Sequence, residues 1–160
     1  MPPRPSPKAK PPPRRAGEFP PHSSSGYLVR DAHRAFQRLL ERRIGPFGVT
    51  RGQWYFLRVL WITDGLSQRE LSARVGMMEP TTVIALRSME KSGLIRRVRD
   101  DDRRKVRVFL TAKAKRLRGE LLGVARTITD EAEAGIAPRD LAAFRRIVAR
   151  MTENLDRIER

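Results

Sequence analysis

Apolar residues recur at helical spacing in two stretches near the start of the chain. The first stretch predicts an amphipathic helix that begins at Ser24 or Ser25 and ends near residues 45–48; its apolar positions are Val29, Ala32, Phe36, Leu39 and Leu40. In the second stretch, Thr50 and Gln53 have the spacing of a capping box, and the helix carries Trp54, Phe56, Leu57, Leu60 and Trp61. The turn pair Asp-Gly at residues 64–65 is expected to end this second helix.

A third, shorter helix is predicted over residues 67–75. Ser67 and Glu70 repeat the capping-box spacing, and a hydrophobic staple is expected from Leu66 and Leu71. Gly76 supplies the left-handed residue at which such a helix ends.

A fourth helix follows at once and ends at Gly93. Pro80 fits its first turn, where the missing N–H of proline has no intrahelical partner to lose. We expect three of its residues to face inward, namely Val83, Leu86 and Met89. The third and fourth helices, with the tight break between them, form a candidate helix-turn-helix.

After Gly93 the apolar period changes from helical to alternating. Val106, Val108 and Leu110 point one way and Arg107 and Phe109 the other, while Ile95 and Val98 lie in a matching run before the charged residues 100–105. This pattern predicts a β-hairpin with a charged tip. A helix-turn-helix followed by such a hairpin is typical of a winged helix, in which one helix enters a major groove and the hairpin reaches the neighbouring minor groove.

Two long helices are predicted at the end of the chain. The first opens at Thr111 with the stripe Ala114, Leu117, Leu121, Val124 and Ile128; Gly135 interrupts it. The second starts at Pro138 with the stripe Leu141, Phe144, Val148, Met151, Leu155 and Ile158. Both stripes exceed what a small winged helix can cover, so we expect them to pack with the first helix and with a second copy of the chain; an intramolecular bundle is the alternative.

The predicted fold is therefore mainly α with a small β-hairpin wing: a winged helix-turn-helix plus a dimerisation bundle of terminal helices. We divide it into a disordered Pro/basic arm at 1–23, an N-terminal dimerisation helix at 24–46, a DNA-binding domain at 47–110 and C-terminal dimerisation helices at 111–160. The arm is expected to add attraction to DNA phosphates through Arg4, Lys8, Lys10, Arg14 and Arg15. A solubilising extension, or one that comes from an early start codon, is the alternative.

The composition favours a polyanionic partner. The chain has 34 Lys+Arg against 18 Asp+Glu and a formal net charge of +16, so nucleic acid is the first expectation and an anionic membrane surface the second. No apolar stretch approaches the length of a membrane helix or forms the core of a signal peptide. We expect a cytoplasmic, nucleoid-associated protein with no membrane partner, which the absence of Cys also fits.

Few residues are available for catalysis or metal binding. With no Cys and only His22 and His33, a catalytic triad or zinc site would have to share two imidazoles, and His22 lies in the Pro/Ser-rich tail. We therefore expect no enzymatic activity, no metal site and no cofactor.

The expected DNA contacts lie on the third and fourth helices. Recognition-helix candidates are Pro80, Thr81, Thr82, Ile84 and Arg87, because Thr and Arg side chains can bond base edges and the Thr methyl can touch a thymine methyl. Phosphate contacts are expected from Ser67 and Gln68, which open the third helix, and from Arg69 and Arg74 further along it. The alternatives are an ordinary solvated helix face and, for Ser67, a cap without a DNA contact.

The wing concentrates basic residues beside three aspartates. Candidate contacts are Arg97, Arg99, Asp102, Arg103, Arg104 and Lys105. We assign insertion into a narrow minor groove to Arg104, which Asp102 would hold in an extended pose through a bidentate pair. An Asp-rich solvated turn is the alternative.

Three segments together resemble the MarR family of winged-helix regulators, above all its SlyA-like members. They are "LSQRELSARVG" from Leu66, "EPTTVIALRSMEKSGLIRR" from Glu79 and "DDDRRKVRVFLT" from Asp100, within a resemblance that spans residues 28–158. The resemblance implies a homodimer that binds a pseudo-palindromic operator and releases it when a small aromatic, anionic molecule binds. Ile84 stands where similar proteins often have Arg, and Arg87 where an acidic residue is common, so the operator sequence is not implied.

An effector pocket is the least constrained prediction. Its candidate residues are Arg30, His33, Trp54 and Arg58, which would give an aromatic wall and an anchor for the carboxylate of an aromatic acid or of a thioester. Core and interface roles are the alternative for Trp54 and His33. The expected function is a sequence-specific DNA-binding transcriptional regulator, a repressor released by such an effector. The rivals are an effector-independent, basic architectural DNA-binding protein and a winged-helix protein-interaction module.

Overall fold

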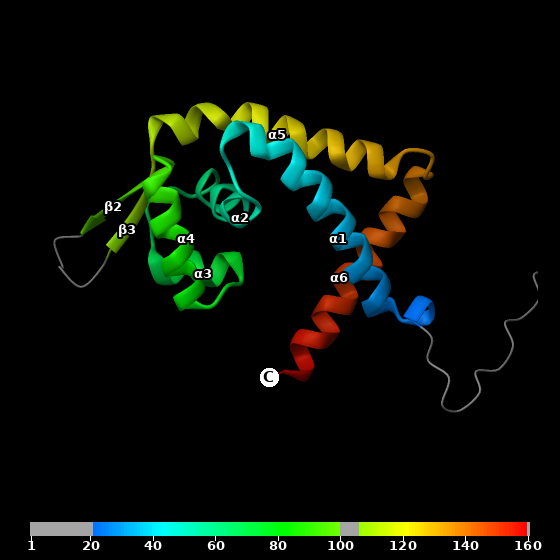
Figure 1. Cartoon of the computed structure of the whole chain (residues 1–160). Helices are drawn as coiled ribbons and strands as arrows, with labels where there is room; N and C mark the ends of the chain where they lie inside the picture. The colour runs from blue at the N-terminus through cyan, green and yellow to red at the C-terminus, as the bar shows by residue number, and fades with distance from the viewer. Residues whose placement is uncertain (1–20, 100–105, 160) are drawn as a thin grey trace, which may run out of the picture. The chain divides into compact units, whose positions relative to one another are not determined.

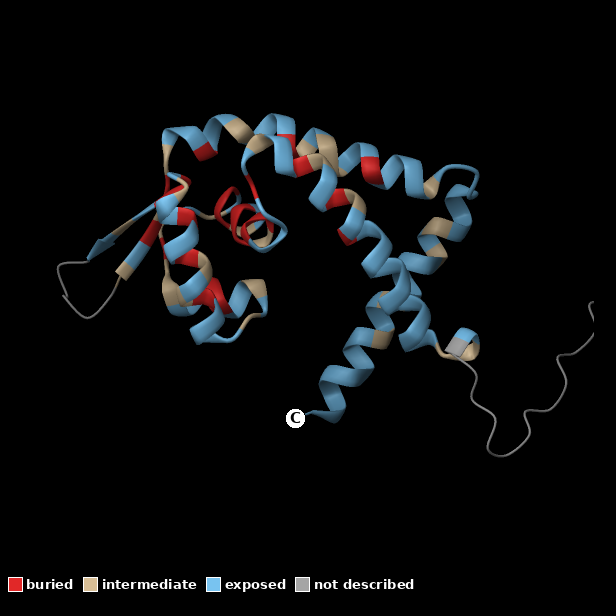
Figure 2. Cartoon of the chain, viewed as in Figure 1, coloured by how far each residue is buried: buried red, intermediate tan, exposed pale blue. Residues whose placement is uncertain are grey.

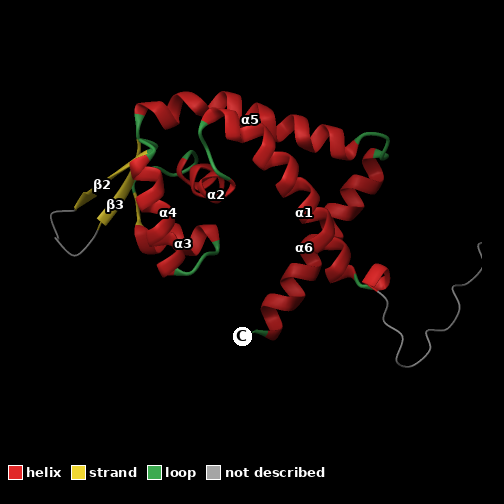
Figure 3. Cartoon of the chain, viewed as in Figure 1, coloured by secondary structure: helices red, strands yellow, loops and turns green. Residues whose placement is uncertain are grey.

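The computed structural model describes residues 21–99 and 106–159. Its helices and strands are η1 (Pro21–Ser23), α1 (Ser25–Ile44), η2 (Gly45–Phe47), α2 (Arg51–Leu60), β1 (Leu66–Ser67), α3 (Gln68–Val75), α4 (Glu79–Lys91), β2 (Ile95–Arg99), β3 (Val106–Leu110), α5 (Ala112–Glu133) and α6 (Pro138–Ile158) (Figure 1). Helices predominate, with one small antiparallel sheet (Figure 3). The chain divides into two compact units, residues 1–35 and 36–160.

The described part of the first unit contains η1 and the first half of α1. The backbone N–H of Tyr27 donates to Ser24 Oγ at 3.3 Å, which confirms that this helix begins at Ser24 or Ser25. The guanidinium of Arg30 lies 4.9 Å from the centre of the Tyr27 ring, one turn away on the same helix.

The second unit is built around α2, whose apolar residues form the centre of the core. Both predicted capping boxes are present, with Thr50 accepting from Gln53 N and Ser67 accepting from Glu70 N. The fully buried residues come from several helices and the sheet, among them Phe56, Leu57, Leu71, Leu86 and Val108. Buried positions follow the inward faces of α2, α3, α4 and α5 (Figure 2). The helices predicted from the apolar pattern are thus confirmed.

The sheet has three strands in the order β1-β3-β2, one more than the sequence predicted. β1 pairs antiparallel with β3 in the register Leu66↔Val108, and β2 pairs with β3 in the register Ile95↔Leu110. These four side chains are all buried, so they form the inner face of the sheet. β1 is only two residues long, too short to show an alternating pattern, and Leu66 had an equally good local explanation as a staple residue.

The second half of α1 and the helix α5 are joined by side-chain contacts. Arg43 donates to Glu131 at 2.7 Å, and Gln37 donates to the hydroxyl of Tyr55 on α2. On α5 the buried residues are Ala114, Leu121 and Ile128, in agreement with the predicted stripe. α5 ends before Gly135, which has a φ of 80° that other residues rarely adopt.

No residue of α6, which the structure describes throughout, is buried within the chain. Three large apolar side chains of its stripe are more than half exposed: Phe144 (59%), Leu155 (62%) and Ile158 (81%). Arg145 donates to Glu133 at 2.7 Å across the turn from α5. Among the described helices none has the length and apolar character needed to cross a membrane.

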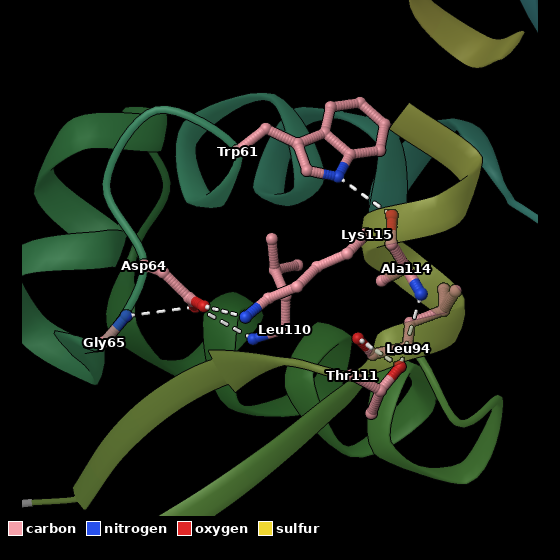
Figure 4. Close-up of polar contacts among 8 residues, drawn as sticks. All are labelled: Trp61, Asp64, Gly65, Leu94, Leu110, Thr111, Ala114 and Lys115. Carbon is pink, nitrogen blue, oxygen red and sulfur yellow. Dashed lines mark hydrogen bonds and ion pairs between the residues drawn. The ribbon is translucent and has the colours of Figure 1, made fainter. Parts of the chain in front are cut away.

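Polar contacts of Asp64 connect α2, the sheet and α5 (Figure 4). Its Oδ1 accepts from the backbone N–H of Gly65 at 3.1 Å and of Leu110 at 2.8 Å, and its Oδ2 lies 3.2 Å from Lys115 Nζ. Nearby, Trp61 Nε1 donates to the carbonyl of Ala114 at 3.0 Å. Gly65 has a φ of 76°, and a Cβ there would lie 2.7 Å from the Phe109 ring, so this turn requires glycine.

Candidate nucleic-acid interface

The outward face of α4 carries four of the five predicted recognition residues. Pro80, Thr81, Ile84 and Arg87 are exposed, and Ile84 is 70% exposed although it is large and apolar. Thr81, Ile84 and Arg87 follow one another at a spacing of three, so they lie along one side of the helix. This face therefore offers a hydroxyl, an apolar side chain and a guanidinium together.

Thr82, the fifth predicted recognition residue, does not lie on that face. Its side chain is fully buried, and its Oγ1 lies 3.1 Å from Ser72 Oγ and 3.2 Å from the carbonyl oxygen of Met78. With Leu86 and Met89 it forms the inward stripe of α4, whereas Val83, which was expected inward, is half-buried. The prediction was wrong because Thr82 finds local hydrogen-bond partners in the core, which removes the cost of burying its hydroxyl.

The first turn of α3 is held by its own side chains. Ser67 donates from its hydroxyl to Glu70 Oε2 at 2.6 Å, and Ser67 N donates to the same oxygen at 2.8 Å. The hydrogen bond from the Ser67 side chain, and then that from its backbone, lowers the pKa of Glu70. Ser67 is therefore a helix cap, as predicted, and its contact with a phosphate stays a prediction.

The other phosphate candidates near α3 differ in how they are held. Gln68 is half-buried at the start of the helix and Arg69 is exposed. Arg74 is exposed and donates to Thr63 Oγ1 at 3.0 Å, which restricts its guanidinium to the side of the turn after α2.

Arginines of the sheet are engaged at the base of the wing, the hairpin formed by β2, β3 and residues 100–105. Arg97 donates to Glu90 Oε2 of α4 through Nη2 at 2.6 Å and Nε at 3.0 Å. These hydrogen bonds lower the pKa of Glu90. Arg107 Nη1 donates to the carbonyl of Gly65 at 3.1 Å, and Arg96 lies 5.0 Å from the centre of the Phe109 ring. These contacts fix the hairpin base against α4 and the turn after α2.

The tip of the wing lies outside the described residues. Asp102, Arg103, Arg104 and Lys105 lie there, so their predicted contacts with DNA stay predictions. Arg99, at the described end of β2, is exposed.

The residues of the predicted effector pocket belong to different units. Arg30 and His33 lie in the first unit, and Trp54 and Arg58 in the second. Trp54 is only 4% exposed and meets Trp61 edge to face, with ring centres 5.9 Å apart; the Arg58 guanidinium lies 5.5 Å from the Trp54 ring centre. Trp54 is thus a core residue in the second unit, and the pocket stays a prediction. Within the described residues, no cluster of His, Asp and Glu is able to hold a metal ion.

Asp64 and Lys115 were missed by the sequence interpretation. The Asp64 side chain contacts the backbone 46 residues further along the chain, so no local pattern signals its role. The Asp-Gly pair indicated a turn but not that its carboxylate anchors β3 and α5.

The MarR family model matches residues 49–106, which extend from the residue before the cap of α2 to the start of β3. A crystal structure of a MarR transcriptional regulator from Methanosarcina mazei Go1 is 30% identical, with a TM-score of 0.76; the match covers 83% of this chain and 96% of that one. The chain belongs to the MarR family. The resemblance and the mainly α fold with a small wing are therefore confirmed.

Two further comparisons are with a curated protein and with a structure solved on DNA. A curated relative, the HTH-type transcriptional regulator TtmR of Methylorubrum extorquens (strain PA1), is 35% identical over 96 residues, or 59% of this chain. The match spans about half of that protein, 49% of its length. The transcriptional repressor CouR, solved bound to a 23-mer DNA duplex, shares the fold at 22% identity and a TM-score of 0.75, over 82% of this chain and 94% of that one.

Replacing Thr82 separates its core role from a contact with DNA. We expect Thr82→Val to lower the free energy of unfolding by about 1–2 kcal/mol, because the buried hydroxyl loses its hydrogen bonds to the α3 side of the core. The matched change Thr81→Val, on the exposed face of α4, should stay within about 0.5 kcal/mol. Urea unfolding of both variants at one protein concentration measures the difference, and equal losses would contradict the assignment.

Proposed function

We propose that the chain is a sequence-specific DNA-binding transcriptional regulator that acts as a homodimer. The observation that carries this proposal is the two-sided character of α4. Its inner face, Thr82, Leu86 and Met89, is buried in the core, while Thr81, Ile84 and Arg87 face outward with no ion pair to Arg87 from any carboxylate in the described ranges. A helix fixed on one side and chemically diverse on the other suits the reading of base edges in a major groove.

The charge of the protein supports a nucleic-acid partner. With a net charge of +16, the chain is attracted to DNA phosphates whatever the base sequence. This part of the binding should weaken steeply as the salt concentration rises. The pairing of Arg97 with Glu90 sets the wing beside α4, so the tip residues Arg103, Arg104 and Lys105 would meet the backbone or minor groove next to the recognition helix.

The uncovered stripe of α6 supports a dimer. Apolar side chains such as Phe144 and Leu155 are more than half exposed in one chain, and a contiguous apolar surface of this kind usually marks an interface. A second copy of the chain, related by a two-fold axis, offers the same stripe in return. Two recognition helices would then enter successive major grooves about 34 Å apart, on a pseudo-palindromic operator.

Repression and its relief by an effector complete the proposal. The family resemblance supports a repressor that releases DNA when a small aromatic acid or thioester binds. Its binding would shift the dimer toward a state in which the two helices that read the DNA are wrongly spaced. In this proposal the protein works beside the nucleoid in the cytoplasm and catalyses no reaction. Isothermal titration with such acids, followed by DNA binding in their presence, tests this part separately.

Competition for DNA tests the central function. Genome-wide mapping of bound DNA first identifies operator sequences. The purified protein should then prefer an operator duplex over bulk genomic DNA by about 10³-fold or more. Equal affinity for both would support the architectural alternative, and no binding to either at moderate salt would support the protein-interaction module.

Ile84 should read the methyl group of thymine. Replacing one contacted thymine by uracil removes a single methyl group, which we expect to weaken operator binding by about fourfold, or about 0.8 kcal/mol. In the Ile84→Ala variant the same replacement should have no effect, whereas Arg87→Ala should keep the difference between the two duplexes. Fluorescence anisotropy with both duplexes measures this. A thymine preference that survives in Ile84→Ala would assign methyl reading to another residue.

Leu155→Asp should dissociate the dimer. Because the symmetry places two such charges in the interface, we expect a loss of about 3 kcal/mol or more, a hundredfold rise in the dissociation constant. Ala149→Asp, on the exposed side of α6 away from the stripe, is the matched control and should leave assembly unchanged. Analytical ultracentrifugation over a range of concentrations provides the measurement; an unaffected Leu155→Asp dimer would exclude this stripe.

A further inference from the structure

Arginines recur along one side of α6. The helix contains five arginines and no lysine, and four of the arginines follow one another at intervals of seven, four and seven residues: Arg139, Arg146, Arg150 and Arg157. In a helix with 3.6 residues per turn, these intervals place all four within about 20° of one direction. All four are exposed, on a helix that has no buried residue (Figure 2). We call these four residues the arginine stripe.

Little negative charge opposes the arginine stripe. Arg139 Nε lies 3.6 Å from Asp140 Oδ1, and both side chains are mostly exposed. The three other arginines of the stripe form no ion pair in the part of the chain that the structure describes. Glu153 is the one acidic residue of α6 that helical spacing places on the same side, against four arginines. The arginine stripe therefore carries a net positive charge that is open to an anionic partner.

The arginine stripe lies on the opposite side of α6 from the proposed dimer interface. Phe144, Val148 and Leu155 point roughly 140–180° away from the arginines. A second copy of the chain can therefore cover the apolar side and leave the arginines exposed. Between the first two arginines, the same side carries Ala142 and Ala143, whose short side chains leave room for a broad partner to approach. The stripe is thus a separate surface, accessible in the dimer as well as in one chain.

The length and chemistry of the arginine stripe fit the backbone of a DNA duplex. The stripe extends over about 27 Å at 1.5 Å per helical residue, which equals the rise of about eight base pairs at 3.4 Å each. Guanidinium groups pair with phosphates bidentately, whereas a lysine acts as a point charge. An anionic membrane fits less well, because a helix binds a bilayer by burying its apolar side in it. That side of α6 is the proposed dimer interface.

We propose that the arginine stripe binds the phosphate backbone of a second DNA duplex, so that the protein bridges two DNA segments. This goes beyond the proposed function, in which α4 reads one operator, because none of the four arginines belongs to α4 or to the wing. A symmetric dimer presents one stripe from each copy. The stripe contacts phosphates alone, so its binding has no sequence preference and weakens as the salt concentration rises.

The test asks whether protein that is bound to one DNA molecule captures another. The full-length protein is bound to genomic DNA fragments on beads at about 50 mM salt, and a labelled duplex of about 12 base pairs is then added. This duplex is long enough to cover the arginine stripe, but too short to hold two half-sites whose centres lie about 10 base pairs apart. We expect the beads to capture the labelled duplex in proportion to the bound protein, whatever its base sequence.

Matched double variants identify the surface that captures the labelled duplex. Arg146→Gln with Arg150→Gln should lower the affinity for this duplex by about tenfold. The slope of log affinity against log salt should fall by about 2, because each lost phosphate contact accounts for about 0.9. The control, Arg126→Gln with Arg145→Gln, removes the same charge from exposed arginines outside the stripe and should change the affinity by less than about twofold. Both variants should bind the immobilised DNA as the unchanged protein does.

The proposal is overturned if the beads capture no labelled duplex, if both double variants lose capture equally, or if the stripe variant loses the immobilised DNA to the same extent. It is also overturned if vesicles of anionic phospholipid bind through the stripe and the duplex does not. Failure of the proposed function looks different. It would abolish the preference for an operator and leave capture sensitive to Arg146→Gln with Arg150→Gln.

Discussion

The carboxylate of Asp64 is the contact on which the arrangement of the DNA-facing elements depends. β1 has only two residues and cannot hold the sheet to α2 by its own hydrogen bonds. Asp64 adds a bond to the end of β3 and an ion pair to α5, and Gly65 beside it allows the Phe109 ring to approach. The turn after α2 therefore sets where the hairpin starts and where the long helix leaves it. Without these ties, the hairpin would still be held to α4 by Arg97 and to the turn by Arg107, but the end of β3 would lose its side-chain contacts with the turn and with α5.

Much of the fold could be predicted because its signals are local. The caps of α2 and α3 depend on residues three apart, Thr50 with Gln53 and Ser67 with Glu70, and both boxes form as expected. Features that depend on distant partners could not be predicted in the same way. The two-residue strand β1 is defined by its pairing with β3, and the buried hydroxyl of Thr82 is satisfied in part by Ser72 of α3. In each case tertiary contacts override what the local pattern indicates.

The candidate site divides along the same line. The exposed face of α4, with Thr81, Ile84 and Arg87, follows from helical periodicity once the helix is recognised. The contacts of Asp64 with Leu110 and Lys115 bring together segments that lie far apart in the sequence, and an Asp-Gly turn gives no sign of them. The residues chosen from sequence for an effector pocket fall into separate units, with Arg30 and His33 in the first and Trp54 and Arg58 in the second. Apolar spacing within one helix does not show whether residues of different helices come together.

The bond pair between Arg97 and Glu90 has a mechanical consequence. It joins the last turns of α4 to the first strand of the hairpin with two hydrogen bonds from one guanidinium to one carboxylate oxygen. The helix and the hairpin are thereby held together by a side-chain contact as well as by the backbone that joins them. A signal that changes how this protein binds a duplex would therefore move α4 and the hairpin together. The longer helices that carry these two elements would take up the deformation.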